Sequence, residues 1–198
     1  MTPDTLELLR ELGHRLRTPL ATVHGYASLV EAHAQDPRVD PADLAVWARR
    51  IQVETDRLNG LLIDLSRLRA VATGTTRSTS LDLRALVGEA VQQAETELDH
   101  SLNLDESGAQ HLPYAGDAAL LKRLAYHLAI LGIQRRQDAT LRLTTSPEGA
   151  RLELRLAAGW TPPQHDVWLV FCAAVAEAHG GRLEHTANGP VAHLGRVA

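Results

Sequence analysis

The chain has 198 residues, 44% of them hydrophobic, and a formal net charge of -4 at pH 7. This length suits one or two small domains with hydrophobic cores. Lysine and arginine are spread out without a basic run, so we expect no nucleic-acid partner. No window approaches the roughly 20 apolar residues of a membrane span, so we expect no membrane segment. The single cysteine, Cys172, excludes an internal disulfide and fits a reducing, cytoplasmic compartment.

The first predicted helix begins at Thr2-Pro3, a pair typical of helix starts, and ends near Ala34. Its apolar residues recur at alternating spacings of three and four. Such a seam indicates a helix that packs lengthwise against other helices. The predicted seam consists of Leu9, Leu12, Leu16, Leu20, Val23, Ala27, Val30 and Ala34.

The same helix carries one histidine opposite its seam. At about 100° per residue, His14 points away from the middle of the Leu12/Leu16 seam, so its imidazole is predicted to face solvent. Thr18, one turn later, shares this face. Pro19 removes a backbone donor and is expected to bend the helix just after the histidine.

A second long helix is predicted after a connector rich in proline and aspartate, with Asp40 as its cap, Pro41 as its first residue and its end near Ala70. Its seam, in which Glu54 is the polar exception, consists of Leu44, Trp47, Ile51, Leu58, Leu61, Leu65 and Leu68. Two long helices with a short loop predict an antiparallel hairpin. One hairpin cannot bury both seams together with Leu62 and Ile63, so we expect a homodimeric four-helix bundle.

The second half of the chain follows a different pattern. We expect a helical hairpin over residues 1–72, a polar linker over 73–80 and an α+β sandwich over 81–198, with helices on one face of a mixed sheet. The predicted helices are 81–98, 117–136 and 166–179. The predicted strands are 101–105, 141–143, 151–156, 182–184 and 191–197, with a hairpin turn at Ser146-Pro147-Glu148-Gly149.

Three separated segments resemble two-component sensor histidine kinases. The stretch GHRLRTPLATVHGYASLVE resembles their H-box, usually Ser-His-Glu-Leu-Arg-Thr-Pro-Leu. The segments RIQVETDRLNGLLIDLSRLRA and AEAHGGRLEH continue the resemblance in the family's order, over nearly the whole chain. The resemblance implies a dimeric helical hairpin, a kinase-like ATP-binding fold and a phosphoryl group on His14. Because Met1 stands close to His14, we expect no input domain on this chain.

The ATP-binding elements of the family are altered here. Its metal-binding asparagines align with His127 and Leu131, and Leu131 offers no oxygen ligand for a hard cation. The adenine-reading aspartate aligns near Ala158, and a glycine turn aligns with Asp166-Val167-Trp168-Leu169. The lid between them is reduced to residues 160–165. These departures predict a degenerate domain without ATP binding, in which Trp160 and Trp168 fill the vacated pocket.

The H-box also departs from the family pattern. Arg15 replaces the acidic residue that is thought to act as base, and arginine stays protonated. We expect Arg15 to pair with phosphate on His14 or with an acidic partner surface. His14, Arg15, Arg17 and Thr18 therefore form the predicted catalytic group, and Thr18 holds the position that orients water for dephosphorylation in the family.

The remaining chemistry is nucleophilic. A neutral imidazole on an exposed helix accepts phosphoryl from a receiver-domain aspartyl phosphate and returns it. The predicted function is therefore a histidine phosphotransferase without autokinase activity, resembling the dimeric histidine phosphotransferases of bacterial phosphorelays. We expect no cofactor or metal on this chain, with magnesium in the receiver, which belongs to a response regulator or a hybrid kinase. The predicted docking surface is Ala21, Thr22, Gly25 and Tyr26, with a position of Tyr26 at the flank of the bundle core left open.

Three other functions are compatible with the same sequence features. The chain is a non-catalytic dimeric scaffold, a receiver phosphatase acting through Thr18, or an active sensor histidine kinase with a remodelled nucleotide site. The ten histidines are scattered without ligand spacing, so a metal site is not expected.

Overall fold

The structure is a computed structural model that describes residues 3–36, 38–106, 111–135, 138–146, 149–156, 160–161 and 166–195. The chain divides into two compact units, Met1–Arg67 and Leu68–Ala198. Each unit is described by itself below. In the described part of the chain, no helix combines the length and the apolar character needed to cross a membrane.

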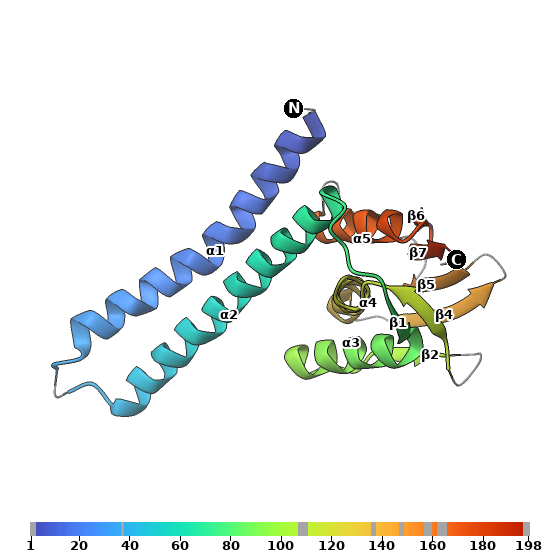
Figure 1. The fold of residues 1–198 in the computed structure, drawn as a ribbon. Coiled ribbons are helices and arrows are strands. Elements are labelled where there is room, and N and C mark those ends of the chain that lie inside the picture. Colours follow the sequence, from blue (N-terminus) through green and yellow to red (C-terminus); the bar gives the residue numbers. More distant parts are fainter. Residues whose placement is uncertain are drawn as a thin grey trace. The chain divides into compact units, whose positions relative to one another are not determined.

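The first unit is the predicted helical hairpin. Helix α1 spans Pro3–His33 and helix α2 spans Pro41–Ala72, the last residues of α2 belonging to the second unit (Figure 1). The side chain of Asp40 accepts a hydrogen bond of 2.8 Å from the backbone N–H of Ala42, so it caps α2 as expected. Pro19 lies inside α1 without interrupting it.

The inner face of α1 differs from the predicted seam after Leu16. Leu12 and Pro19 are buried, whereas Leu20 is 58% exposed in the single chain. The inward positions continue through half-buried Val23, Tyr26, Val30 and His33. Within the single hairpin the inward positions step by three residues from Leu16 to Pro19, where the predicted seam steps by four to Leu20, and Ala27 and Ala34 of that seam are exposed as well. On α2 every predicted seam position from Leu44 to Leu68 is half-buried, as is Glu54.

A five-stranded sheet forms one layer of the second unit, in the order β2-β4-β5-β7-β6. Its strands are β2 (Asn103–Asp105), β4 (Thr140–Ser146), β5 (Gly149–Arg155), β6 (Arg182–Thr186) and β7 (Gly189–Gly195). β2 pairs with β4 in parallel, and all the other neighbours are antiparallel. The predicted mixed sheet is thus confirmed. The turn residues 147–148 and the predicted strand end at 196–197 lie outside the described residues.

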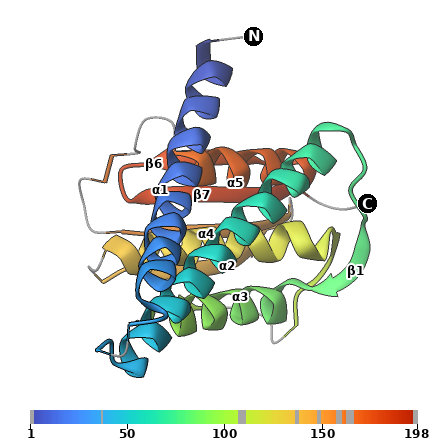
Figure 2. The same ribbon diagram turned by 90° about the vertical axis from the view of Figure 1, so that its left-hand side faces the viewer.

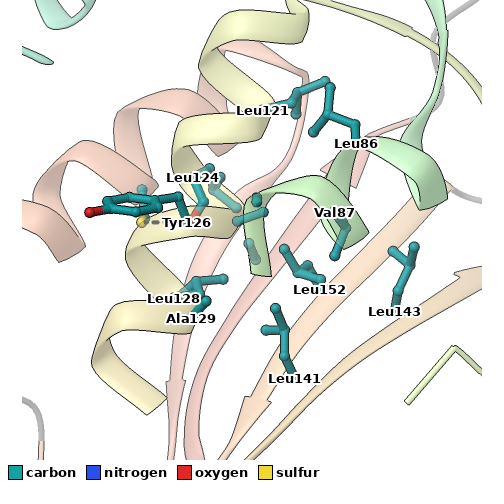
Figure 3. Close-up of a cluster of buried hydrophobic side chains, with 14 of the residues drawn as sticks. Leu86, Val87, Leu121, Leu124, Tyr126, Leu128, Ala129, Leu141, Leu143 and Leu152 are labelled. Atoms are coloured by element: carbon teal, nitrogen blue, oxygen red, sulfur yellow. Dashed lines mark hydrogen bonds between the residues drawn. The ribbon is translucent and has the colours of Figure 1, made fainter. Parts of the chain in front are cut away.

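Three helices cover one face of this sheet: α3 (Leu83–Leu98), α4 (Ala118–Arg135) and α5 (Val167–Ala178) (Figures 1 and 2). Leucines of α3 and α4 gather with leucines of the strands to form the core (Figure 3). Leu124, Leu141 and Leu152 are at most 2% exposed. The observed architecture confirms the predicted helical hairpin followed by an α+β sandwich.

One pair of strands was not predicted. β1 (Thr79–Asp82) pairs antiparallel with β3 (Pro113–Gly116), so the end of the predicted linker and the start of the predicted helix at residue 81 are strand. The serine and threonine run suggested a linker because its pairing partner lies far along the chain. Asp82 then caps α3: its Oδ1 accepts hydrogen bonds from the N–H groups of Arg84 and Leu112.

Asp82 also gives the fold a testable acid sensitivity. The His111 ring 2.7 Å away, and next the Leu112 N–H, lower the pKa of Asp82 from 3.8 to about 2. A carboxyl with a lowered folded-state pKa stabilises the fold above about pH 4, and this contribution is lost as the pH falls through about 2. We expect the urea midpoint of wild type to exceed that of Asp82→Asn above pH 4 and the two to converge toward pH 2.

The matched control is Asp99→Asn, at the left-handed C-cap of the same helix, where asparagine is well tolerated. A midpoint difference between wild type and Asp82→Asn that stays constant from pH 5 to pH 2 would contradict this assignment.

Candidate functional site

The candidate site in the first unit centres on His14, which is exposed on α1. Thr18, one turn further, is exposed as well, and its hydroxyl lies 3.5 Å from the backbone oxygen of His14. Thr22 donates a 3.1 Å hydrogen bond to the backbone oxygen of Thr18. Because Pro19 has no N–H, the helix lacks one hydrogen bond next to His14. The imidazole thus stands on a solvent-facing surface, as the helical periodicity predicted.

The two arginines beside His14 differ in their surroundings. Nε of Arg15 lies 2.8 Å from Oε1 of Glu11, and both side chains are about one-third exposed. The guanidinium predicted to pair with phosphate therefore already pairs with a carboxylate of its own helix. Arg17 is exposed three residues after His14.

The predicted docking residues divide between two faces. Ala21 and Gly25 are exposed, whereas Thr22 and Tyr26 are half-buried. Tyr26 falls on the inner face of α1, three residues after Val23, which corresponds to the core-flank position left open above. The exposed members of the predicted docking surface, Ala21 and Gly25, are therefore both small.

The positions aligned with the family's magnesium ligands lie on α4 in the second unit. His127 is 5% exposed and its ring stacks on that of Trp168 from α5, with centroids 4.2 Å apart and planes at 15°. Phe171 meets the same imidazole edge-on at 5.3 Å. Leu131 is half-buried against the core. Neither side chain offers the oxygen that a hard cation prefers, so a magnesium ion bound with a nucleotide here would take its protein ligands from other residues.

The loops next to this helix pair are only partly described. Trp160 is 9% exposed, and its buried indole N–H has no hydrogen-bond partner within the part of the chain that the structure describes. Asp166 caps α5, accepting a 2.8 Å hydrogen bond from the N–H of Trp168. Residues 157–159, where the adenine-reading loop is expected, and 162–165 lie outside the described residues. The described residues therefore do not test the predicted loss of ATP binding. Among the described residues, no cluster of histidine, cysteine or acidic side chains could hold a metal ion.

Comparison with known proteins identifies the first unit. Residues 5–71 match the His Kinase A (phospho-acceptor) domain. Across 83% of the chain there is 29% identity to the probable sensor histidine kinase TcrY of Mycobacterium tuberculosis, and across 89% there is 25% identity to the sensor protein KdpD of Escherichia coli. These matches cover 31% and 22% of the two relatives, so the chain spans less than a third of either.

Solved structures show the same fold. The Acinetobacter baumannii histidine kinase AdeS matches 93% of this chain and 98% of its own with a TM-score of 0.71 and 17% identity. A histidine kinase from Burkholderia phymatum matches both chains in full with a TM-score of 0.55 and 16% identity. The chain therefore has the fold of histidine kinases, with a helical hairpin that matches the phospho-acceptor domain followed by an ATPase-like fold.

These findings contradict the function predicted from the sequence. A histidine phosphotransferase without autokinase activity is wrong, because the phospho-acceptor domain, the relatives and the solved structures all point to sensor histidine kinases. That prediction relied on substituted ligand positions, and a local substitution set does not outweigh agreement over the whole chain.

The stacking of His127 on Trp168 leads to a prediction about stability. Trp168→Ala removes the ring that covers His127, and we expect it to lower the free energy of unfolding by about 2 to 4 kcal/mol. The control Val170→Ala, on the same helix at a side chain that is 40% exposed, should cost about 0.5 kcal/mol or less. Urea unfolding of both variants measures the difference, and equal midpoints would show that the stack contributes nothing.

Proposed function

We propose that this chain is the phospho-acceptor and ATPase-like part of a sensor histidine kinase, with His14 as the residue that carries the phosphoryl group. The observation that carries the proposal is the exposed imidazole of His14 on a helix that matches the phospho-acceptor domain. The similarity to TcrY and KdpD supports the kinase assignment.

The proposed chemistry needs one nitrogen nucleophile. A neutral ring nitrogen of His14 attacks the phosphorus, a P–N bond forms, and the P–O bond to the donor's leaving oxygen breaks. In the return step an aspartate oxygen of a receiver attacks and the P–N bond breaks. Solvent exposure of His14 lets a macromolecular partner reach it.

The side chains next to His14 assist the transfer and the loss of the phosphoryl group. Arg17, exposed and cationic, stabilises negative charge on the transferred group. Thr18 presents its hydroxyl on the same face and orients water when phosphoryl is lost. Arg15 reaches phosphate only by leaving Glu11, so its role is secondary to that of Arg17.

A homodimer is part of the proposal. Large apolar side chains of the hairpin that stay exposed in the single chain are Leu20, Leu29, Val46, Val53, Leu62 and Ile63. Burial of such residues favours association of two hairpins into a four-helix bundle. The bundle would extend over residues 1–72, followed by a linker that ends before β1 at Thr79 and by the ATPase-like domain.

The proposed partner is the receiver domain of a response regulator. A similar structure, histidine kinase ThkA in complex with response regulator protein TrrA, supports this class of partner, with a TM-score of 0.56 over 93% of this chain and 15% identity. Exposed Ala21 and Gly25 permit close approach of a receiver to α1 next to His14, with Thr22 and Tyr26 behind them. We place the reaction in the cytoplasm, which suits a buried Cys172 that is a thiol and not part of a disulfide.

The test measures transfer of label to His14 from two donors, magnesium ATP and a receiver domain phosphorylated on aspartate. We expect acid-labile label on wild type from ATP, and exchange of that label with the receiver. His14→Gln should lose at least about 99% of it, because the nucleophile is absent. His24→Gln, at another exposed histidine of α1, is the matched control and should label like wild type.

Two outcomes count against the proposal. Labelling of His14→Gln at the wild-type level would remove His14 as the acceptor. Label that reaches His14 from the receiver but never from ATP would contradict the kinase assignment while keeping the acceptor.

A further inference from the structure

A buried histidine lies at the C-terminal end of α5, in the second unit. His179 is 9% exposed, and its Nδ1 lies 2.7 Å from the backbone oxygen of Val175. A carbonyl oxygen only accepts, so Nδ1 carries the ring proton. The other nitrogen, Nε2, accepts a 3.0 Å hydrogen bond from the backbone N–H of Asp117. The geometry therefore requires the neutral ring with its proton on Nδ1.

Asp117 connects this ring to the chain that enters the domain. Its Oδ1 accepts hydrogen bonds from the N–H groups of Ala119 and Leu120 and caps α4. Its Oδ2 accepts a 2.9 Å hydrogen bond from the backbone N–H of Arg77. Arg77 stands in the segment between α2 and β1. One aspartate thus joins the imidazole, the start of α4 and the entering segment.

The surroundings hold the imidazole in one place. A Cβ added to Gly116 would lie 2.8 Å from Cδ2 of His179, so the ring packs directly on the β3 backbone. The backbone oxygen of His179 accepts from the N–H of Gly195, whose own oxygen accepts from the hydroxyl of Tyr114. The ring cannot turn to a new partner without disturbing β3 or β7.

We propose that His179 and Asp117 form an acid-sensitive pair of hydrogen bonds, here called the clasp, that ties the Arg77 backbone to the cap of α4. The clasp opens when His179 is protonated. Protonation would place an Nε2–H donor against the Asp117 N–H donor, and two donors cannot share a hydrogen bond. The described titratable groups around the ring are the Asp117 carboxylate on α4 and Tyr114 on β3, whose ring centroid is 6.3 Å away. Because both carboxylate oxygens already accept backbone N–H groups, the protonated ring gains no carboxylate partner, and the clash at Nε2 displaces the Asp117 backbone and with it the hydrogen bond from the Arg77 N–H to Oδ2.

Opening the clasp frees the segment that continues from α2 into the ATPase-like domain. Where that domain and the hairpin cooperate in phosphoryl transfer, this release regulates the reaction, and that consequence rests on the proposed function. The clasp itself does not depend on it, because it is a property of the second unit.

The experiment follows amide hydrogen exchange of Arg77 in the full chain between about pH 8 and pH 5, corrected for the intrinsic exchange rate. We expect wild type to lose about tenfold or more of its Arg77 protection as the pH falls, the size expected for a hydrogen bond to a charged group. In His179→Gln the amide side chain offers an acceptor and a donor that do not titrate. The corrected protection of the Arg77 amide in this variant should therefore not change with pH. His100→Gln, at an exposed histidine after α3, should behave like wild type.

Two further measurements keep the test decisive if His179→Gln folds poorly. In wild type the Arg77 amide resonance should titrate together with the His179 ring protons, while amides of the central strands β4 and β5 keep their protection. Arg77 protection in wild type that is absent at pH 8, or unchanged down to pH 5, would overturn the clasp. Loss of protection in β4 and β5 together with Arg77 would show general acid unfolding and would overturn it as well.

Discussion

The second unit depends on burial of α4 between the sheet and its two neighbouring helices. Ten of its residues are buried, and Leu124 and Leu128 meet the strands while His127 meets Trp168 of α5. Because the helix is buried on so many sides, the unpaired backbone N–H and C=O groups at its two ends need hydrogen-bond partners close by. Asp117 does this at the N-terminus through Ala119 and Leu120. The same aspartate is thereby available to hold the entering chain.

The hairpin is stabilised differently. Its seam positions on α2 are half-buried, and several large apolar residues face solvent in the single chain. A long helix gains most of its stability from packing of its apolar face. An incompletely buried seam therefore explains why a second hairpin belongs to the proposed assembly. Association through the seam would leave the opposite face, with His14, Arg17 and Thr18, accessible to a partner.

Periodicity predicted the elements well wherever the signal was local. The two long helices, the cap at Asp40 and the mixed sheet all follow from patterns within a few residues of each other. β1 was missed because Thr79–Asp82 is defined by pairing with Pro113–Gly116, more than thirty residues later. Leu20 lies off the inner face of the single hairpin because three- and four-residue steps look alike in sequence until a partner helix selects one.

The site shows the same division. Exposure of His14 followed from the helical wheel, whereas the Arg15–Glu11 pair, the His127–Trp168 stack and the His179–Asp117 contact depend on side-chain geometry or tertiary packing. The glycines after His179 signalled only a helix end. The predicted function was wrong for a different reason: the resemblance to histidine kinases covered nearly the whole chain, but the substituted ligand positions were given more weight than that resemblance.

Direct localisation of the phosphoryl group tests the central claim most simply. The phosphorylated protein is digested near neutral pH, where phosphohistidine survives, and its peptides are mapped by mass spectrometry. We expect one phosphoryl group, on the α1 peptide that contains His14. A phosphoryl group on any other residue, with the His14 peptide unmodified, would contradict it.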